Sequence, residues 1–387
     1  MAEKAMGERE REKKMGKVQK EQLLHTLSLH LNTIHETLQL LDQTPASTLD
    51  RVKWEEVVQM GEQLKKQATI TGLLSAEESP DLKMLEENMA TYFNMLQGLL
   101  LLSHGSKVGA GPTLSSSIQA SVKQVVDCSF MMFKEAMACY GSRNRERRST
   151  VPQLVGALWD SCAALKKNPA TNVTAIGRAL TNVAVTVKDV LREMKELKPA
   201  SSYPEDESKD VSSPAESSAD AEGKHDDDDG DDDDPGEGDL GNDLSPEEMK
   251  IAQLAIQVVS ETLVVLKELI RSITSLHKRE NPKGSNDLVN SLEKLLKQCQ
   301  GIGVQIDELG ACLYPPQEVS AMRNALSKIS NISNELQSEV ECMKGSLEPL
   351  SQALNGLKTA IRQLESGLVS SDSDLVSEME KLDVNNQ

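Results

Sequence analysis

Apolar residues recur at spacings of three and four along most of the chain, which is the periodicity of one face of an α-helix. No segment shows the alternation of apolar and polar residues that marks a β-strand. In the first half this periodicity predicts six amphipathic helices, separated by short polar or Gly- and Pro-containing runs. Their expected ranges are 17–43, 49–72, 80–103, 113–140, about 149–167, and a last helix that follows Pro169 and carries apolar residues to Met194.

The second half opens with a sequence typical of a helix N-terminus. Ser245 stands at the N-cap position, Pro246 follows in the first turn, and Glu248 lies three residues after the serine, which together form a capping box. An apolar run follows directly. We predict four helices here, over 245–279, 286–313, 317–345 and 346–369.

The last of these predicted helices has the most regular heptad pattern in the chain. Its apolar positions alternate in spacings of three and four: Leu347, Leu350, Leu354, Leu357, Ile361, Leu364 and Leu368. The flanking positions are mostly small, and only two of six are charged, whereas a dimeric zipper uses charges there to select its partner. We therefore expect Leu357 and Ile361 to be buried inside a bundle, although a zipper for a partner or for a second copy of the chain remains the alternative.

Composition supports helices throughout, because only nine of 387 residues are Phe, Trp or Tyr. Charge then divides the chain. Residues 199–243 hold 18 acidic and 2 basic residues, so most of the net charge of −19 lies in this one stretch. A segment of this kind repels itself and buries no apolar surface, so it is expected to be disordered.

The predicted fold is therefore all-α, with two antiparallel helical bundles joined by a disordered acidic linker. The expected organisation is a charged N-terminal extension at 1–16, an N-terminal bundle at 17–198, the linker at 199–243, a C-terminal bundle at 244–369 and a disordered acidic tail at 370–387.

The chain contains no recognisable catalytic or cofactor-binding motif, so we expect neither enzymatic activity nor a bound cofactor or metal. His25, His30 and His35 are five residues apart and do not share one helix face. The six cysteines form no CxxC pair and are expected to be buried and reduced. Four arginines between 143 and 148 form a basic cluster, interpreted as an interhelical loop, an import signal or an anion-binding patch.

Direct nucleic-acid binding is poorly supported, because few aromatic residues are available to stack on bases. No apolar run approaches 18 residues, so no membrane span is expected.

Ser213, Ser217 and Ser371 stand in short acidic or Ser-Pro contexts and are candidate phosphorylation sites. The acidic stretch itself could be a passive tether, or it could bind basic partners or mask a basic surface of its own protein.

Several local patterns, taken in order, resemble the cyclin-D-binding protein family, also described as helix-loop-helix proteins without a basic region. They are Trp54 with Ala68-Thr69, Leu158-Trp159 with Cys162, Val187-Lys188-Asp189 with Glu193-Met194, the acidic stretch, and Leu313-Tyr314-Pro315-Pro316 before a long helix. The resemblance implies helical bundles like those of the talin rod. It also implies a cytoplasmic and nuclear regulator that binds D-type cyclins or helix-loop-helix transcription factors and dampens cell-cycle entry.

The resulting hypothesis is a non-enzymatic interaction protein that negatively regulates cell-cycle progression and the associated transcription. The alternative is a cytoskeletal or adhesion scaffold of the talin and vinculin kind. We expect a partner to contact a bundle surface or a groove between helices, with the N-terminal bundle as the better candidate. That bundle holds Trp54 and Trp159, and Trp is enriched at binding hot spots. Each tryptophan has the alternative of serving only the core.

Overall fold

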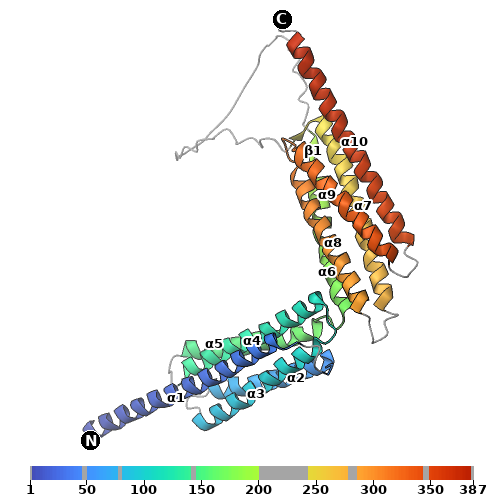
Figure 1. Ribbon diagram of the computed structural model, residues 1–387. Helices are drawn as coiled ribbons and strands as arrows, with labels where there is room; N and C mark the ends of the chain where they lie inside the picture. Colours follow the sequence, from blue (N-terminus) through green and yellow to red (C-terminus); the bar gives the residue numbers. More distant parts are fainter. Residues whose placement is uncertain are drawn as a thin grey trace, which may run out of the picture. The chain divides into compact units, whose positions relative to one another are not determined.

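The computed structural model is all-α apart from one short strand pair, and the order of its helices follows the sequence prediction (Figure 1). It describes the backbone of residues 2–45, 50–76, 81–140, 145–199, 243–277, 286–342 and 348–384. Side chains are described over the somewhat narrower ranges 15–45, 50–75, 81–140, 150–199, 244–275, 287–341 and 348–370. By internal compactness the chain divides into two units, the first formed by residues 1–179 with 273–296, and the second by 180–272 with 297–387. This confirms the prediction of two helical bundles.

The first unit is built around five helices that follow one another along the chain (Figure 1). They are α1 (Ala2–Gln43), α2 (Trp54–Ala76), α3 (Leu82–Ser106), α4 (Pro112–Cys139) and α5 (Arg145–Ala164), and α5 continues into a short 3₁₀ turn at Leu165–Lys167. Contacts join α2 to α3, α2 to α5, α4 to α5 and α1 to α3. The unit is therefore a bundle with a single continuous core.

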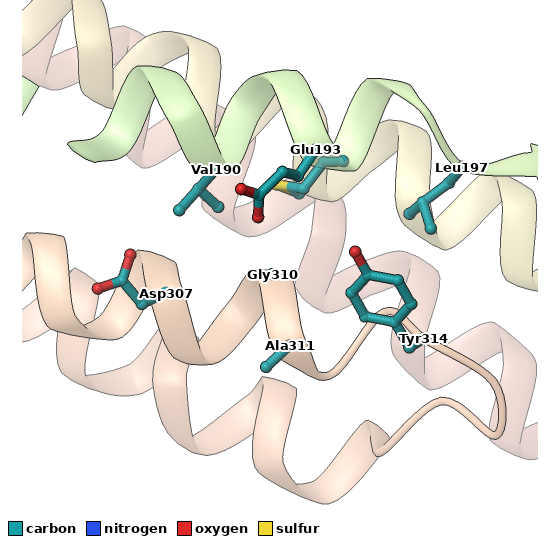
Figure 2. Close-up of a pocket in the computed structure, with 8 residues that line it drawn as sticks. Val190, Glu193, Leu197, Asp307, Gly310, Ala311 and Tyr314 are labelled. Carbon is teal, nitrogen blue, oxygen red and sulfur yellow. The ribbon is translucent and has the colours of Figure 1, made fainter. Parts of the chain in front are cut away.

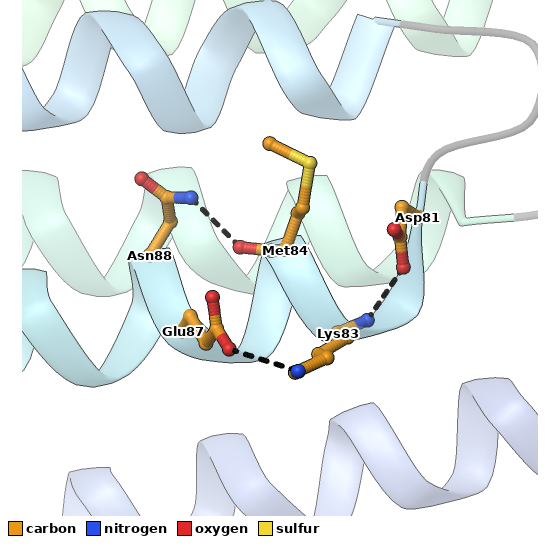
Figure 3. A network of polar contacts seen from close by, with 5 residues as sticks. All are labelled: Asp81, Lys83, Met84, Glu87 and Asn88. Carbon is orange, nitrogen blue, oxygen red and sulfur yellow. Dashed lines mark hydrogen bonds and ion pairs between the residues drawn. The ribbon is translucent and has the colours of Figure 1, made fainter.

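The start of α3 shows how local polar contacts set a helix boundary (Figure 3). The Asp81 carboxylate accepts a hydrogen bond of 2.9 Å from the Lys83 backbone N–H, which satisfies one of the donors left free at a helix N-terminus. The Lys83 ammonium lies 3.8 Å from the carboxylate of Glu87, one turn further along the helix. An exposed i,i+4 ion pair of this kind adds only a few tenths of a kcal/mol to helix stability. The Asn88 amide donates to the Met84 carbonyl at 2.7 Å. The cap thus determines where α3 begins, and the exposed pair contributes little.

The second unit contains most of α6 (Asn172–Lys195), α7 (Pro246–His277) and α8 (Asn286–Ala311), together with α9 (Val319–Cys342) and α10 (Glu348–Val384) (Figure 1). The predicted capping box at the start of α7 is confirmed. The Ser245 backbone N–H donates to the Glu248 carboxylate at 2.9 Å, and the Glu248 backbone N–H donates to the Ser245 hydroxyl at 3.2 Å. The heptad positions of α10 from Leu350 to Leu368 are buried, which confirms the burial predicted for Leu357 and Ile361.

The position of α6 differs from the sequence prediction. The N-terminal bundle was expected to include this helix to residue 198, but the helix passes from the first unit into the second at Leu180. Its later turns pack on α8, where a Cβ on Gly303 would lie 3.3 Å from the Val183 side chain. Helical periodicity shows which face of α6 is apolar, but it does not show which helices that face meets.

Both ends of the acidic stretch consequently belong to the second unit. Directly after α6, β1 (Lys198–Pro199) pairs in parallel with β2 (Asp243–Leu244), which leads into α7. Lys198 faces Asp243, and Pro199 faces Leu244. Residues 200–242, where a disordered linker was predicted, lie outside the described residues. The strand pair shows that the stretch leaves and re-enters the unit at one place.

Two predicted boundaries are wrong because the helices continue further. The 1–16 extension is already helical from Ala2, and the tail expected to be disordered from residue 370 continues α10 to Val384. The sequence gives a reason for the second error, since Leu375 and Leu382 continue the seven-residue spacing from Leu368, and Met379 lies four residues after Leu375. Once a helix has nucleated, each further residue adds a hydrogen bond at small entropic cost. Likewise, α5 begins at Arg145, so Arg145 to Arg148 lie in a helix and not in a loop.

One helix of the described ranges, α7, is long and apolar enough to satisfy the length and composition of a membrane span. The sequence had predicted none. Half of the most apolar window of α7 is buried inside the protein, and a core helix of a bundle meets the same criterion. This feature is therefore weak evidence for a membrane segment.

Candidate protein-interaction surfaces

The two tryptophans proposed as partner-binding residues occupy different environments. Trp54 is 7% exposed at the first turn of α2, and its indole N–H donates to the Leu165 carbonyl at 2.9 Å. This bond joins the beginning of α2 to the end of α5, and it satisfies the one polar group of a buried indole. The Trp54 side chain therefore acts as a core residue in this conformation.

Trp159 lies on α5 and leaves 38% of its surface exposed. The Lys65 ammonium of α2 stands 5.4 Å from the centre of its ring, within the range of a cation–π contact. An ion pair of 2.7 Å between Lys166 and Glu62 also bridges the α2 and α5 sides of the bundle. A half-exposed indole held beside a cation matches the composition of binding hot spots. Trp159 therefore remains a candidate for partner contact, and Trp54 does not share its surface.

The candidate phosphorylation sites remain predictions. Ser213 and Ser217 lie outside the described residues. Ser371 is part of α10, immediately after the last residue whose side chain is described.

The five cysteines whose side chains are described lie in the core. Cys128, Cys139, Cys162, Cys299 and Cys312 are buried, as predicted, and none of these five forms a disulfide, while the side chain of Cys342 is outside the described set. Burial raises the pKa of Cys162 and of Cys299 to about 12, so both thiols stay protonated at neutral pH and are poor nucleophiles. In the described part of the chain, no three His, Cys, Asp or Glu side chains gather in a way that could hold a metal ion.

A groove between α6 and α8 was not foreseen from the sequence (Figure 2). Its cavity measures about 310 Å3. One side is lined by residues of the α6 segment and the other by residues of the α8 segment: Val190, Glu193, Met194 and Leu197 face Asp307, Gly310, Ala311 and Tyr314. Most of the lining surface is apolar.

Small residues lie on the α8 side of the hollow. The α8 backbone passes so close to α6 at Gly310 that a Cβ there would lie 2.9 Å from a methyl group of Val190. Gly303, two turns earlier on the same face, makes the second close approach. Ala311 follows Gly310 and fills little of the remaining space. The glycine and alanine at 310 and 311 are the sequence signal for this groove, although such a pair says nothing about which helix lies opposite.

The groove is negatively charged. The carboxylates of Glu193 and Asp307 extend into it from opposite helices, and the Tyr314 hydroxyl points toward α6 (Figure 2). Partial burial raises the pKa of Asp307, because the charged form loses some of its solvation. The neighbouring cation Arg192 is engaged elsewhere, in a contact of 3.4 Å with Asp189. The groove can therefore accept apolar groups together with positive charge.

Comparison with protein-family models gives two matches, and the two follow one another along the chain. Residues 56–200 match the N-terminal model of the Grap2 and cyclin-D-interacting family, and residues 226–338 match its C-terminal model. Together they cover about two thirds of the sequence. The boundary between them falls in the acidic stretch, whereas the division between the structural units falls within α6.

No curated protein matched the chain when the two were compared directly. The family models therefore carry the assignment, and their matched ranges include the motifs at Trp159, Glu193 and Tyr314, while Trp54 lies two residues before the first range. Both models bear the same description and occur in the expected order. The chain belongs to the Grap2 and cyclin-D-interacting protein family.

Proposed function

We propose that this protein binds a D-type cyclin and thereby restrains cell-cycle progression and the associated transcription, as an interaction protein without catalytic activity. The observation that carries this proposal is the pair of family matches, since the family is described as cyclin-D-interacting. The fold is consistent with such a role, because helical bundles present extended helix faces to partner proteins. The proposed site of action is the cytoplasm and the nucleus, which imaging of the tagged full chain would test.

For the contact itself we propose the exposed α2–α5 face around Trp159. This indole is the only tryptophan with a substantially exposed surface, since Trp54 is buried. The Lys65 ammonium over its ring adds a positive charge, which an acidic side chain of the partner would pair with. Removal of a hot-spot tryptophan typically costs binding at least 2 kcal/mol, or about thirtyfold in affinity.

The test is capture of a purified D-type cyclin by the immobilised full-length chain. Wild-type protein is expected to retain the cyclin, and Trp159→Ala is expected to weaken retention about thirtyfold. Met131→Ala, a substitution at a half-exposed residue of α4, is the matched control and should bind like wild type. Circular dichroism of both variants verifies that the bundle is intact.

Two results would count against the proposal in different ways. Failure of the wild-type chain to retain any D-type cyclin contradicts the function itself. Retention that is unaffected by Trp159→Ala contradicts only the assigned face. Expression of the chain in dividing cells tests the regulatory part, for which a delayed entry into S phase is expected.

A further inference from the structure

The α6–α8 groove combines three properties that together specify a ligand. Its lining is mostly apolar, and on the α8 side it includes the small residues Gly310 and Ala311. A cavity of about 310 Å3 is at the small end of ligand sites, which suits a few apolar side chains better than a whole cofactor.

The charge of the groove limits the class of ligand further. In the described ranges neither Glu193 nor Asp307 forms an ion pair, so two carboxylates on facing walls carry no compensating cation. Phosphate groups and nucleic acid would be repelled by this arrangement. A peptide that brings lysine or arginine would supply the missing charges while its apolar side chains enter the groove.

The position of the groove in the chain adds a third argument. Leu197 lines the groove, and the next two residues form β1, where the acidic stretch with a net charge of −16 leaves the unit. The charge of that stretch has the same sign as Glu193 and Asp307, so it does not supply the cations that the groove lacks. It instead raises the local concentration of basic segments through long-range attraction.

We propose that the α6–α8 groove binds an amphipathic helix of a partner protein, in which apolar anchors are flanked by lysine or arginine. Anchors spaced at i, i+3 or i+4, and i+7 enter between Val190, Met194 and Tyr314. The flanking cations pair with Glu193 and Asp307. The site is separate from the proposed cyclin contact at Trp159, and neither proposal depends on the other.

The probe is a fluorescein-labelled amphipathic peptide of about 16 residues, with leucine at helical spacing and lysine beside it. Binding to the full-length chain is measured by fluorescence anisotropy. One control peptide has the same composition in a scrambled order, and a second carries glutamate in place of lysine. We expect the amphipathic basic peptide to bind at least about tenfold more tightly than either control. Equal binding of the scrambled peptide would overturn the proposal, because it would show attraction by charge alone.

Variants locate the site. Ala311→Trp places a large side chain in the groove from an exposed position, so the fold should survive and binding should weaken about tenfold or more. The double variant Glu193→Gln with Asp307→Asn is expected to weaken binding about fivefold. Its matched control is Glu196→Gln with Glu308→Gln, which removes the same charge from exposed positions outside the groove and should bind like wild type.

Three outcomes would contradict the groove as the binding site. These are unchanged affinity in Ala311→Trp, equal weakening by the two double variants, and complete loss of binding when the eight aspartates between 226 and 234 are replaced by serine. The last replacement is expected to slow association and to leave the tenfold preference over the scrambled peptide in place. Should Ala311→Trp unfold, the two double variants still decide the question.

Discussion

The two units reach a buried core by different chemistry. In the first unit Tyr92, Phe93 and Phe133 pack against one another, with ring centres 4.8–5.8 Å apart, and His30 stacks on Phe93 at 5.1 Å. This cluster joins α1, α3 and α4 at one place. The buried Tyr92 hydroxyl has a hydrogen-bond partner, since it lies 2.6 Å from the hydroxyl of Ser129. A few large side chains thus hold several helices together.

The second unit has no such cluster in its described side chains. Its core residues are aliphatic and repeat along each helix, most regularly on α10, where Ala353 and Ala360 flank the leucine seam. Tyr314 is its only described aromatic residue, and it is 44% exposed. Stability is therefore distributed along helix seams, and the α6–α8 groove lies beside the close approach at Gly310. The comparison indicates that the stability of the first unit depends on a few large side chains, whereas that of the second is shared among many aliphatic ones.

The difference can be measured with two spectroscopic probes. Both tryptophans of the chain lie in the first unit, so intrinsic tryptophan fluorescence reports unfolding of that unit. Circular dichroism at the helical wavelengths reports both units. A substitution that destabilises one unit should therefore move the two signals differently.

The largest effect is expected from Phe133→Ala. Truncation of a fully buried phenylalanine costs about 3–5 kcal/mol, from lost burial and from the cavity that remains. The tryptophan fluorescence transition in urea should shift to lower denaturant accordingly. Met131→Ala, two residues away but half exposed, should leave the transition nearly unchanged. If both variants behave alike, the aromatic cluster does not concentrate the stability of the first unit.

Leu357→Ala tests the aliphatic seam in the same way. This side chain is fully buried in α10, so its truncation should destabilise the second unit by about 2–5 kcal/mol. The loss should appear in circular dichroism without a matching shift of tryptophan fluorescence. Val304→Ala on α8, where the valine is 61% exposed, serves as the control. A fluorescence shift as large as the dichroism shift would show that the two units unfold together.

A smaller effect is expected at the crossing of α6 and α8. Gly310→Ala places a Cβ 2.9 Å from a methyl group of Val190, whose branched side chain has little freedom to move. Overpacking of this kind costs about 1–3 kcal/mol, and thermal unfolding followed by circular dichroism measures it. Gly156→Ala in α5 is the control, and its effect should have the opposite sign. The added Cβ meets nothing within 4 Å, so the free energy of unfolding should rise by about 0.5–1 kcal/mol. A stabilised Gly310→Ala variant would contradict the close approach.

The smallest effect near neutral pH concerns Cys299. Burial raises its pKa to about 12, well above the value of about 8.5 in an unfolded chain. The folded state therefore holds the proton more tightly, and this thiol costs stability only as pH rises from about 8.5 toward 12. We expect Cys299→Ala to be less stable than wild type at pH 7, and the difference to narrow between about pH 8 and 10. Urea unfolding at several pH values measures the difference in free energy of unfolding between the variant and wild type. A difference that stays constant with pH would contradict the raised pKa of Cys299.

Local features were predictable because each depends on residues close together in the chain. The Ser245–Glu248 capping box, the cysteine burial and the leucine seam of α10 all follow from spacing and residue type. The boundaries at Ala2 and Val384 were missed for a related reason. We interpreted charged segments at the two ends as lying outside the helices, although Glu, Lys and Arg are good helix formers.

The candidate sites were less predictable. Trp54 and Trp159 look equivalent in the sequence, and their different exposure arises from which neighbours reach them: the Leu165 carbonyl for Trp54 and the Lys65 ammonium for Trp159. The α6–α8 groove has residues more than a hundred positions apart in the chain on its two walls. A hollow of that kind depends on the packing of two helices, so neither wall predicts it alone.

The amino-acid sequence was sufficient to establish an all-helical chain, two bundles, the strongly acidic stretch and the family, since each of these depends on composition, period or ordered motifs. The sequence did not show to which of the two units α6 belongs. A charged stretch between two helical regions has the composition of a domain boundary, but its ends meet in β1 and β2 within one unit. The physical reason is that an amphipathic face requires an apolar surface to cover it without specifying which one, and helix packing makes that choice.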